Sequence, residues 1–284
     1  TSAIGRLLAA IETGYSPADY RVVLAICRGG IVPAVLAAAY LQKPLVLLEL
    51  SPSFALRPFG KDLRSPQRKL VIEDMVHSGR TLQVAACRLK ADLPREWENV
   101  HKFVTVGRAL NAWVSPHVLE ERVDALVDFS IQDGGLIDVR KDATAKVDED
   151  AAAWAMGRFR DLLTQYAGAA ERDGALASDL RKVCEEGGRL RPWAFVSDPA
   201  LLLRTAAWMY PLVQDADTVA AGSRYGLPLA TLLCAMGVYT GRRKNLVYFR
   251  GIGGSAEYGL VPPGSCTNVA FVDSMVHHLS LIHI

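Results

Sequence analysis

The sequence predicts an α/β protein whose mainly parallel sheets are flanked by helices. Short apolar runs that suit strands buried on both faces, such as residues 21–27, alternate with segments that suit helices. These strand–turn–helix units follow one another along the chain, which is typical of a parallel sheet covered on both faces. Similar units also recur about 200 residues apart, which predicts two domains of this kind.

The composition excludes several classes of protein. Of the 284 residues, 50% are hydrophobic and 22% are charged, which is ordinary for a globular chain with a real core. The net charge of +2 is too small and too dispersed to indicate nucleic acid or a membrane surface as a partner, and no apolar stretch has the length of a transmembrane helix. The five cysteines are scattered without a Cys-x-x-Cys pair, which favours a reducing cytoplasm and argues against zinc.

The most informative segment covers residues 69–82. An apolar strand leads into two adjacent carboxylates, Glu73 and Asp74, and a small-residue turn over residues 78–81 then opens a helix. Ligands of open α/β sheets bind at strand ends, and such a turn offers N–H groups and hydroxyls to an anion. Acids beside an anion-binding turn suit a ligand that carries sugar hydroxyls next to a phosphate. A capped strand–helix turn with surface acids is the alternative.

A second segment lies 45 residues upstream of Glu73. The apolar run 21–27 ends in Arg28-Gly29-Gly30, and an alanine-rich helix follows over residues 34–40. Two glycines let the backbone approach a ligand closely or take a positive φ, and Arg28 adds a positive charge at the same point. Alone, Arg-Gly-Gly is more often an ordinary turn. The two segments support each other because they occupy equivalent places in successive units.

Together these segments resemble the type I phosphoribosyltransferases, which use phosphoribosyl pyrophosphate (PRPP). The resemblance implies transfer of ribose 5-phosphate from PRPP to a nucleobase with release of pyrophosphate, as in nucleotide salvage or synthesis. It implies that Glu73 and Asp74 are the catalytic residues and bind the ribose hydroxyls. It also implies the following PRPP-binding residues: Arg28, Gly29 and Gly30 for the pyrophosphate, and His77, Ser78, Gly79, Arg80 and Thr81 for the 5′-phosphate. Only His77 stands where the family usually has a smaller residue.

The resemblance implies Mg²⁺ as a cofactor, since pyrophosphate leaves poorly unless its charge is neutralised. Because the ligand and water supply most of the metal's oxygens in such sites, Glu73 and Asp74 are only indirect partners of the ion. PRPP and a nucleobase are the expected ligands, no nucleic acid or membrane is expected, and the expected location is cytoplasmic. The acceptor base and a homodimer stay open. A non-catalytic, PRPP- or nucleotide-sensing regulator of the same fold is the alternative function.

The repeat predicts one domain over residues 1–143 and another over residues 144–284. Glu73-Asp74-Met75-Val76-His77 reappears as Asp273-Ser274-Met275-Val276-His277 after an apolar strand. The charged stretch 140–150 reads as the linker between the domains. It leads into an amphipathic helix over about residues 150–166, with these apolar residues toward one side: Trp154, Phe159, Leu162, Leu163 and Tyr166. Asp198-Pro199 predicts the start of another helix.

The two copies are not equivalent. The first resembles the purine-type enzymes, and the second resembles the orotate branch through Tyr248-Phe249-Arg250 and Glu257-Tyr258-Gly259. In the second copy Ser274 replaces Asp74, and residues 278–281 read His-Leu-Ser-Leu in place of the phosphate turn. The second domain is therefore expected to be degenerate or truncated at its PRPP motif, with an incomplete sheet.

Two further regions of the first copy complete the prediction. Residues 51–69 form a connection rich in prolines and basic residues, which suits a loop that closes over a polyanion, although a solvated surface loop would look the same. Its basic residues are Arg57, Lys61, Arg64, Arg68 and Lys69. Strands are expected over residues 100–106 and 124–129.

Overall fold

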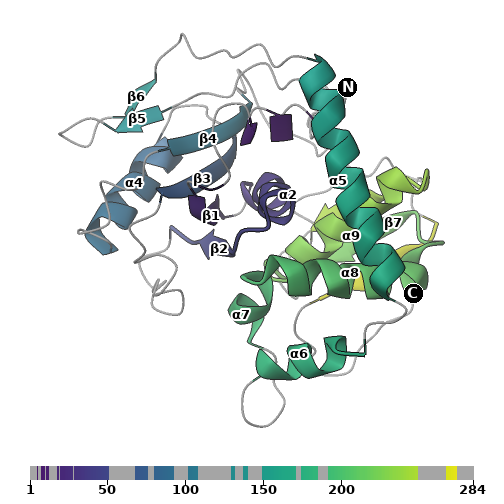
Figure 1. Ribbon diagram of the computed structural model, residues 1–284. Coiled ribbons are helices and arrows are strands. Elements are labelled where there is room, and N and C mark those ends of the chain that lie inside the picture. The colour runs from purple at the N-terminus through teal and green to yellow at the C-terminus, as the bar shows by residue number, and fades with distance from the viewer. Residues whose placement is uncertain are drawn as a thin grey trace. The chain divides into compact units, whose positions relative to one another are not determined.

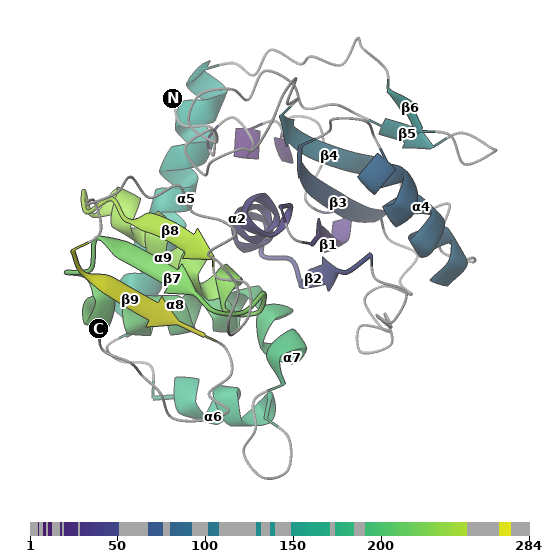
Figure 2. The same ribbon diagram turned by 180° about the vertical axis from the view of Figure 1, so that it is seen from behind.

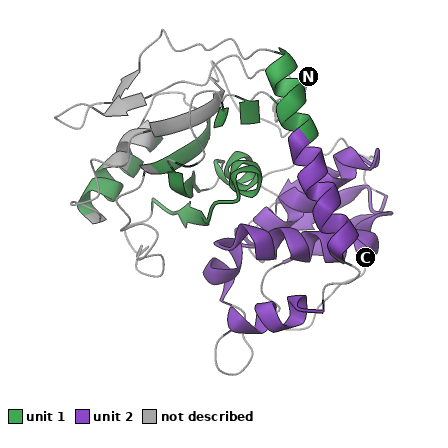
Figure 3. Cartoon of the chain, in the orientation of Figure 1, with its two compact units in different colours: residues 1–157 green, residues 158–284 purple. Residues whose placement is uncertain are grey.

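The chain contains helices and strands in mixed order, with runs of consecutive strands and of consecutive helices between the strand–helix units (Figure 1). The computed structural model describes residues 5, 8–9, 11–12, 18, 20–27, 29–50, 68–75, 80–92, 102–107, 129–131, 137–139, 149–170, 174–184, 191–248 and 267–273. The chain divides into two compact units, Thr1–Gly157 and Arg158–Ile284 (Figure 3). The division falls within α5 (Glu149–Ala170), whereas the predicted boundary between residues 143 and 144 lies outside the described residues.

Unit 1 contains a mixed sheet whose strands run in the order β2-β1-β3-β4-β5-β6. The bounds are β1 (Tyr20–Ile26), β2 (Leu45–Leu48), β3 (Arg68–Met75), β4 (Lys102–Gly107), β5 (Phe129–Ile131) and β6 (Ile137–Val139). The first four strands in this order are parallel, and β5 and β6 add an antiparallel edge. The predicted class, α/β with parallel strands and flanking helices, is therefore confirmed.

The centre of this sheet is buried because its strands are apolar on both faces. The β1 residues from Val22 to Ile26 have no exposed surface, and the same is true of Leu70, Val71 and Ile72 in β3. Helix α2 (Ile31–Leu41) follows β1 and packs on β1 and β3. Ten of its eleven residues are buried, so this helix belongs to the core of the unit and holds the turn before it in a fixed place.

Unit 2 contains a parallel sheet in the order β8-β7-β9, formed by β7 (Thr218–Ala221), β8 (Asn245–Tyr248) and β9 (Val269–Val272). Figure 2 shows these strands side by side, with α8 (Pro199–Val213) and α9 (Leu227–Tyr239) behind them. Two shorter helices, α6 (Leu176–Lys182) and α7 (Pro192–Val196), precede α8. The predicted start of α8 is confirmed, because the Asp198 side chain accepts a hydrogen bond of 2.9 Å from the Leu201 N–H.

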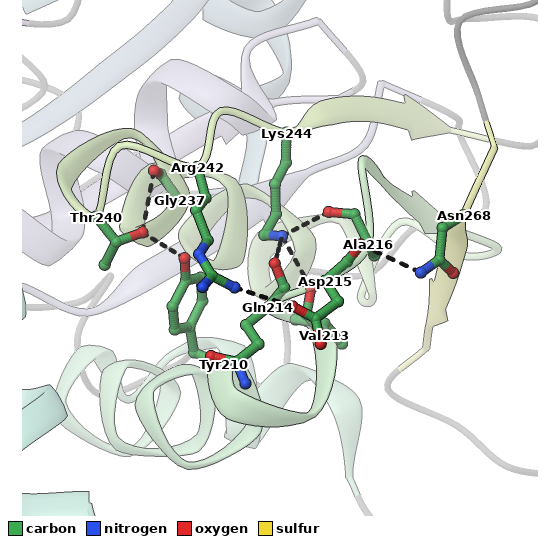
Figure 4. A network of polar contacts seen from close by, with 10 residues as sticks. All are labelled: Tyr210, Val213, Gln214, Asp215, Ala216, Gly237, Thr240, Arg242, Lys244 and Asn268. Atoms are coloured by element: carbon green, nitrogen blue, oxygen red, sulfur yellow. Dashed lines mark hydrogen bonds and ion pairs between the residues drawn. The ribbon is translucent and has the colours of Figure 1, made fainter.

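The end of α8 is held by a lysine from the segment that precedes β8 (Figure 4). Lys244 Nζ donates hydrogen bonds to the carbonyl oxygens of Val213, Gln214 and Ala216, at 2.8, 2.8 and 2.6 Å. A cation at this point satisfies carbonyl groups that the helix leaves without partners and complements the negative end of its dipole. The contact is structural, since it lies at the end of a helix and involves only backbone acceptors.

Two side-chain predictions are wrong. Lys69, counted with the basic connection 51–69 as well as at the start of the apolar strand, has no exposed surface and lies in β3, so its place in the loop is wrong and its place in the strand is confirmed. Trp154, predicted on the apolar side of its helix, is 56% exposed, while Phe159 and Leu163 of the same helix are buried as predicted. Residues 100–101 and 124–128 of the two other predicted strands lie outside the described residues. Within the part of the chain that the structure describes, no helix could span a membrane.

Candidate functional site

The candidate site lies at the carboxyl ends of β1 and β3 in unit 1. From β1 the chain passes through α2 to β2 on one side, and β3 lies on the other side of β1. The direction of the connections therefore changes between β1 and β3, and such a point is where open α/β sheets leave a crevice for ligands. Two of the predicted segments meet here: Gly29-Gly30 follows β1, and Glu73-Asp74 lies near the end of β3.

Gly30 is required by the close approach of the turn to β3. A Cβ atom at this position would overlap the carbonyl oxygen of Ile72 and lie 2.8 Å from that of Ile26. The φ of Gly30 is −66°, and Gly241 is the one glycine with a positive φ among those described. A positive φ, one of the two reasons that the sequence offers for the glycine pair, therefore does not apply at Gly30, and the close approach that the structure shows there is to β3.

Gly29 brings the same turn against Asp74. A Cβ at Gly29 would overlap the carboxylate of Asp74, so the bare backbone of residue 29 is what lets the acid lie there. Asp74 is half-buried, whereas the neighbouring Glu73 is buried. The turn after β1 and the acid of β3 thus form one continuous surface at the edge of the sheet.

Glu73 has a different environment from its neighbour. Its side chain is only 6% exposed, and its Oε2 atom is buried without a hydrogen-bond partner among the described residues. Burial, followed by a hydrogen bond to the Asp74 side chain and by the negative charge of Asp74, raises the pKa of Glu73 to about 10. The backbone N–H of Asp74 acts in the opposite direction without outweighing these effects. Glu73 therefore keeps its proton at neutral pH.

The other predicted residues are placed only in part. Arg80 is the first residue of α4 (Arg80–Asp92), and Thr81 is exposed in the first turn of that helix. Arg28, His77, Ser78 and Gly79 lie outside the described residues. The described residues thus bring together four of the predicted ten: Gly29, Gly30, Glu73 and Asp74.

Unit 2 has the same backbone arrangement between β7 and β9. Ala25 of β1 pairs with Leu47 and Ile72, and Ala221 of β7 pairs with Tyr248 and Val272. The residue after Ile72 is Glu73 and the residue after Val272 is Asp273, so the strand register matches the alignment of the sequence repeat.

A glycine again ends the turn. Gly226 stands before α9 as Gly30 stands before α2, and a Cβ there would lie 2.9 Å from the Val272 carbonyl oxygen. Gly222 lies near the acid of unit 2: a Cβ atom at residue 222 would be 3.2 Å from Asp273 Oδ2.

One polar residue at the unit 2 edge was not predicted. Ser223 Oγ donates a hydrogen bond to Asp273 Oδ1 and accepts one of 3.0 Å from the Gly226 N–H. A serine three residues before the N-cap of a helix is a signal for such a turn, since its hydroxyl bonds nearby backbone groups. The exposed acid of unit 2 is therefore bonded within its own turn. In the part of the chain that the structure describes, no cluster of three or more His, Cys, Asp or Glu could hold a metal ion.

Comparison with known proteins gives two distant structural likenesses. No family model matches this chain, and no curated protein matches it. A purine phosphoribosyltransferase from Pyrococcus horikoshii Ot3 is similar at 20% identity and a TM-score of 0.30, over 40% of this chain and 78% of that chain. A putative sugar binding protein from Salmonella typhimurium LT2 is similar at 15% identity and a TM-score of 0.24, over 87% of this chain and 67% of that chain. At these TM-scores the two structures establish neither a family nor an activity for this chain.

Proposed function

We propose that unit 1 is a phosphoribosyltransferase, which moves ribose 5-phosphate from PRPP to a nucleobase and releases pyrophosphate. The observation that carries this proposal is the meeting of a carboxylate pair with a side-chain-free turn at the β1–β3 switch point. An accessible carboxylate at a strand end suits sugar hydroxyls, and the helix start that follows the turn suits an anionic group.

Asp74 is the residue that faces the sugar. Its half-exposed carboxylate can accept hydrogen bonds from the ribose hydroxyls. When pyrophosphate departs, the anomeric carbon gains oxocarbenium-like charge, and a fixed carboxylate near the ring stabilises that charge. The nitrogen of the base attacks directly, so the protein has to position the two reactants and supplies no covalent nucleophile.

The turn after β1 contributes polarity. The Gly30 N–H already donates to the Ile26 carbonyl at 3.0 Å, and the missing side chain of Gly30 lets the turn pack against β3. Donors come from the first turn of α2, where helical N–H groups lack partners within the helix and the dipole favours an anion. Arg28 adds a positive charge to this turn. The 5′-phosphate belongs to residues 77–81, where Thr81 offers an exposed hydroxyl at the start of α4.

The site fits a Mg²⁺ ion that would be carried by the pyrophosphate. Phosphate oxygens are hard ligands that this ion prefers, and among the described residues no cluster of three or more His, Cys, Asp or Glu provides a ligand set from the protein. When bound, the ion supplies neutralisation of the leaving group's charge. Neither Glu73 nor Asp74 is expected to bind it directly.

A pyrophosphate-release assay with a panel of bases tests the proposal. The full chain is mixed with PRPP, Mg²⁺ and each of hypoxanthine, guanine, xanthine, adenine and orotate. We expect release with at least one base. Asp74→Asn should lower kcat by about 100-fold or more, with a smaller change in PRPP affinity, because the charge acts mainly in the transition state.

Asp273→Asn is the matched control, because it removes the carboxylate at the equivalent edge of unit 2. It should leave turnover unchanged. Equal losses in the two variants, or full activity of Asp74→Asn, would contradict the assignment of the site. PRPP binding without turnover for any base would instead identify the non-catalytic, PRPP-sensing alternative.

A further inference from the structure

The two acids of the candidate site differ in what they can touch. Glu73 is almost fully buried, with one oxygen bonded to Asp74 and the other without a partner in the described part of the chain. Asp74 is half-exposed, and its carboxylate lies against the bare backbone of Gly29, at the edge where a ligand would arrive. A ligand that reaches Asp74 therefore meets a surface from which Glu73 is withdrawn.

We propose that Glu73 is a positioning residue, whose buried neutral carboxyl donates a hydrogen bond to Asp74, and that Asp74 alone contacts the sugar. This inference rests on the proposed function for the identity of the ligand. The hydrogen bond between Glu73 and Asp74 does not depend on the proposed function, because it is present in the protein without ligand.

The hydrogen-bond inventory of the pair supports this division. Two ionised carboxylates have only acceptor oxygens and cannot bond to each other, so a bond between Glu73 and Asp74 requires a proton on one of them. That proton belongs on the buried partner, because burying an ionised group without a counter-charge costs far more than burying a neutral acid. A protonated Glu73 also leaves its second oxygen as a carbonyl acceptor, whose lack of a partner is less costly than that of an anion.

The arrangement has a consequence for Asp74. The donor of Glu73 and the Gly29 backbone both lie against its carboxylate and restrict the rotation of that group. A group held in its reactive orientation before the ligand binds does not have to be ordered during the reaction. Replacing Glu73 should therefore affect turnover through Asp74, and the effect should depend on the donor at residue 73 and not on its charge.

The test compares three variants of the full chain. Glu73→Gln keeps a donor of the same shape and should leave kcat and PRPP affinity within a factor of about 3 of the wild type. Glu73→Ala removes the donor and should lower kcat by roughly 10- to 100-fold, with a smaller change in the KM for PRPP. Rescue by glutamine but not by alanine is the pattern of a positioning residue. A loss in Glu73→Gln as large as that in Asp74→Asn would overturn the proposal, because it would mean that the charge of Glu73 is needed.

A second measurement needs no ligand and so separates this inference from the proposed function. Infrared spectroscopy of the free protein at pH 7 should show the C=O stretch of a protonated carboxylic acid, which disappears in Glu73→Gln and stays in the control Glu149→Gln. Glu149 is exposed in the first turn of α5, so its substitution should not affect this band. Absence of the band in the wild type would overturn the inference. Its presence in a protein that binds no PRPP would overturn only the proposed function.

Discussion

At the scale of single residues, the central feature is a buried acid next to an accessible one. Glu73 and Asp74 are adjacent in sequence, yet one is 6% exposed and the other is half-buried. Their chemistry differs because desolvation penalises the charged form only where water is excluded. The pair therefore combines an accessible acid with a buried, neutral hydrogen-bond donor, and substitutions of the two residues should affect stability and turnover differently.

Glu73→Gln should stabilise the ligand-free protein, increasingly as the pH rises. The folded-state pKa of Glu73, about 10, lies above its ordinary value of 4.5. The contribution of the neutral Glu73 to the free energy of unfolding is therefore fully present below pH 4.5, and it is lost as the pH rises toward 10. Glutamine does not ionise, so at pH 8 the variant should be more stable by on the order of 1–4 kcal/mol.

Urea unfolding of both proteins between pH 5 and pH 9 measures this difference. The gap in the free energy of unfolding should widen with pH, while any gap between Glu149→Gln and the wild type should stay constant over this range. A gap that is constant with pH would mean that Glu73 does not keep its proton in the folded protein.

Thr81→Ala should weaken PRPP binding. The hydroxyl is exposed in the first turn of α4, and in the proposed site it bonds a charged phosphate oxygen. Loss of such a bond costs on the order of 1.5–3 kcal/mol. Calorimetry measures the change in affinity, with Thr164→Ala as the control because Thr164 is an exposed threonine on α5. Unchanged affinity for PRPP in Thr81→Ala would contradict the proposal that α4 contributes to the phosphate site.

At the scale of elements, the β1–α2 turn fixes the distance between the first helix and the sheet. Gly30→Ala should destabilise the protein by about 1–3 kcal/mol, because its Cβ would overlap the Ile72 carbonyl oxygen. Gly157→Ala is the control, since no neighbouring atom lies within 4 Å of its Cβ and alanine is the better residue inside a helix. That substitution should stabilise by about 0.5–1 kcal/mol. Denaturant unfolding that ranks the two variants in the opposite order would refute the close approach.

A second prediction at this scale concerns β9, the strand that directly precedes Asp273. Asp217 Oδ2 accepts hydrogen bonds from the Thr267 N–H and Oγ1, both at 2.7 Å, and from the Asn268 N–H at 3.1 Å, which holds the start of β9 beside β7. These bonds lower the pKa of Asp217 to about 2. Their stabilisation is present above the ordinary pKa of 3.8 and is lost as the pH falls toward 2.

Asp217→Asn should therefore be less stable than the wild type at pH 7, and the two proteins should converge as the pH is lowered from 4 to 2. Thermal unfolding across this range is the measurement. If Asp217→Asn is still less stable than the wild type at pH 2, the effect comes from the shape of the side chain and not from its charge.

Much of the local structure could be predicted from residues alone. The apolar run before Gly29, the apolar run before Glu73 and the capping pair Asp198-Pro199 each specify an element through local chemistry, and each appears where expected. β2 was not predicted, since four apolar residues after a helix do not by themselves distinguish a strand from a loop.

Burial was the less predictable property. Lys69 lies in a basic stretch of sequence, yet the neighbouring strands on both sides cover it. Whether Glu73 faces a ligand or the interior likewise depends on α2 and the adjacent strands and not on the two-residue pattern. Sequence therefore located the candidate site but could not assign different roles to its two acids.

At the scale of the whole molecule, β2-β1-β3 of unit 1 and β8-β7-β9 of unit 2 have the same order, and both units have a glycine turn, but they differ at the acid. In unit 1 an accessible Asp74 is paired with a buried acid, whereas in unit 2 the single Asp273 is bonded to Ser223. Residues 278–281 of unit 2 contain no glycine that would let N–H groups converge on a phosphate. We therefore expect one PRPP site per chain, in unit 1.

Calorimetric titration of the full chain with PRPP and Mg²⁺ tests this central claim most directly. We predict one site per chain, unchanged in Asp273→Asn and abolished or reduced to weak phosphate binding when Glu73→Ala and Asp74→Ala are combined. Two sites per chain, or a PRPP site that survives the combined change at full affinity, would contradict the account.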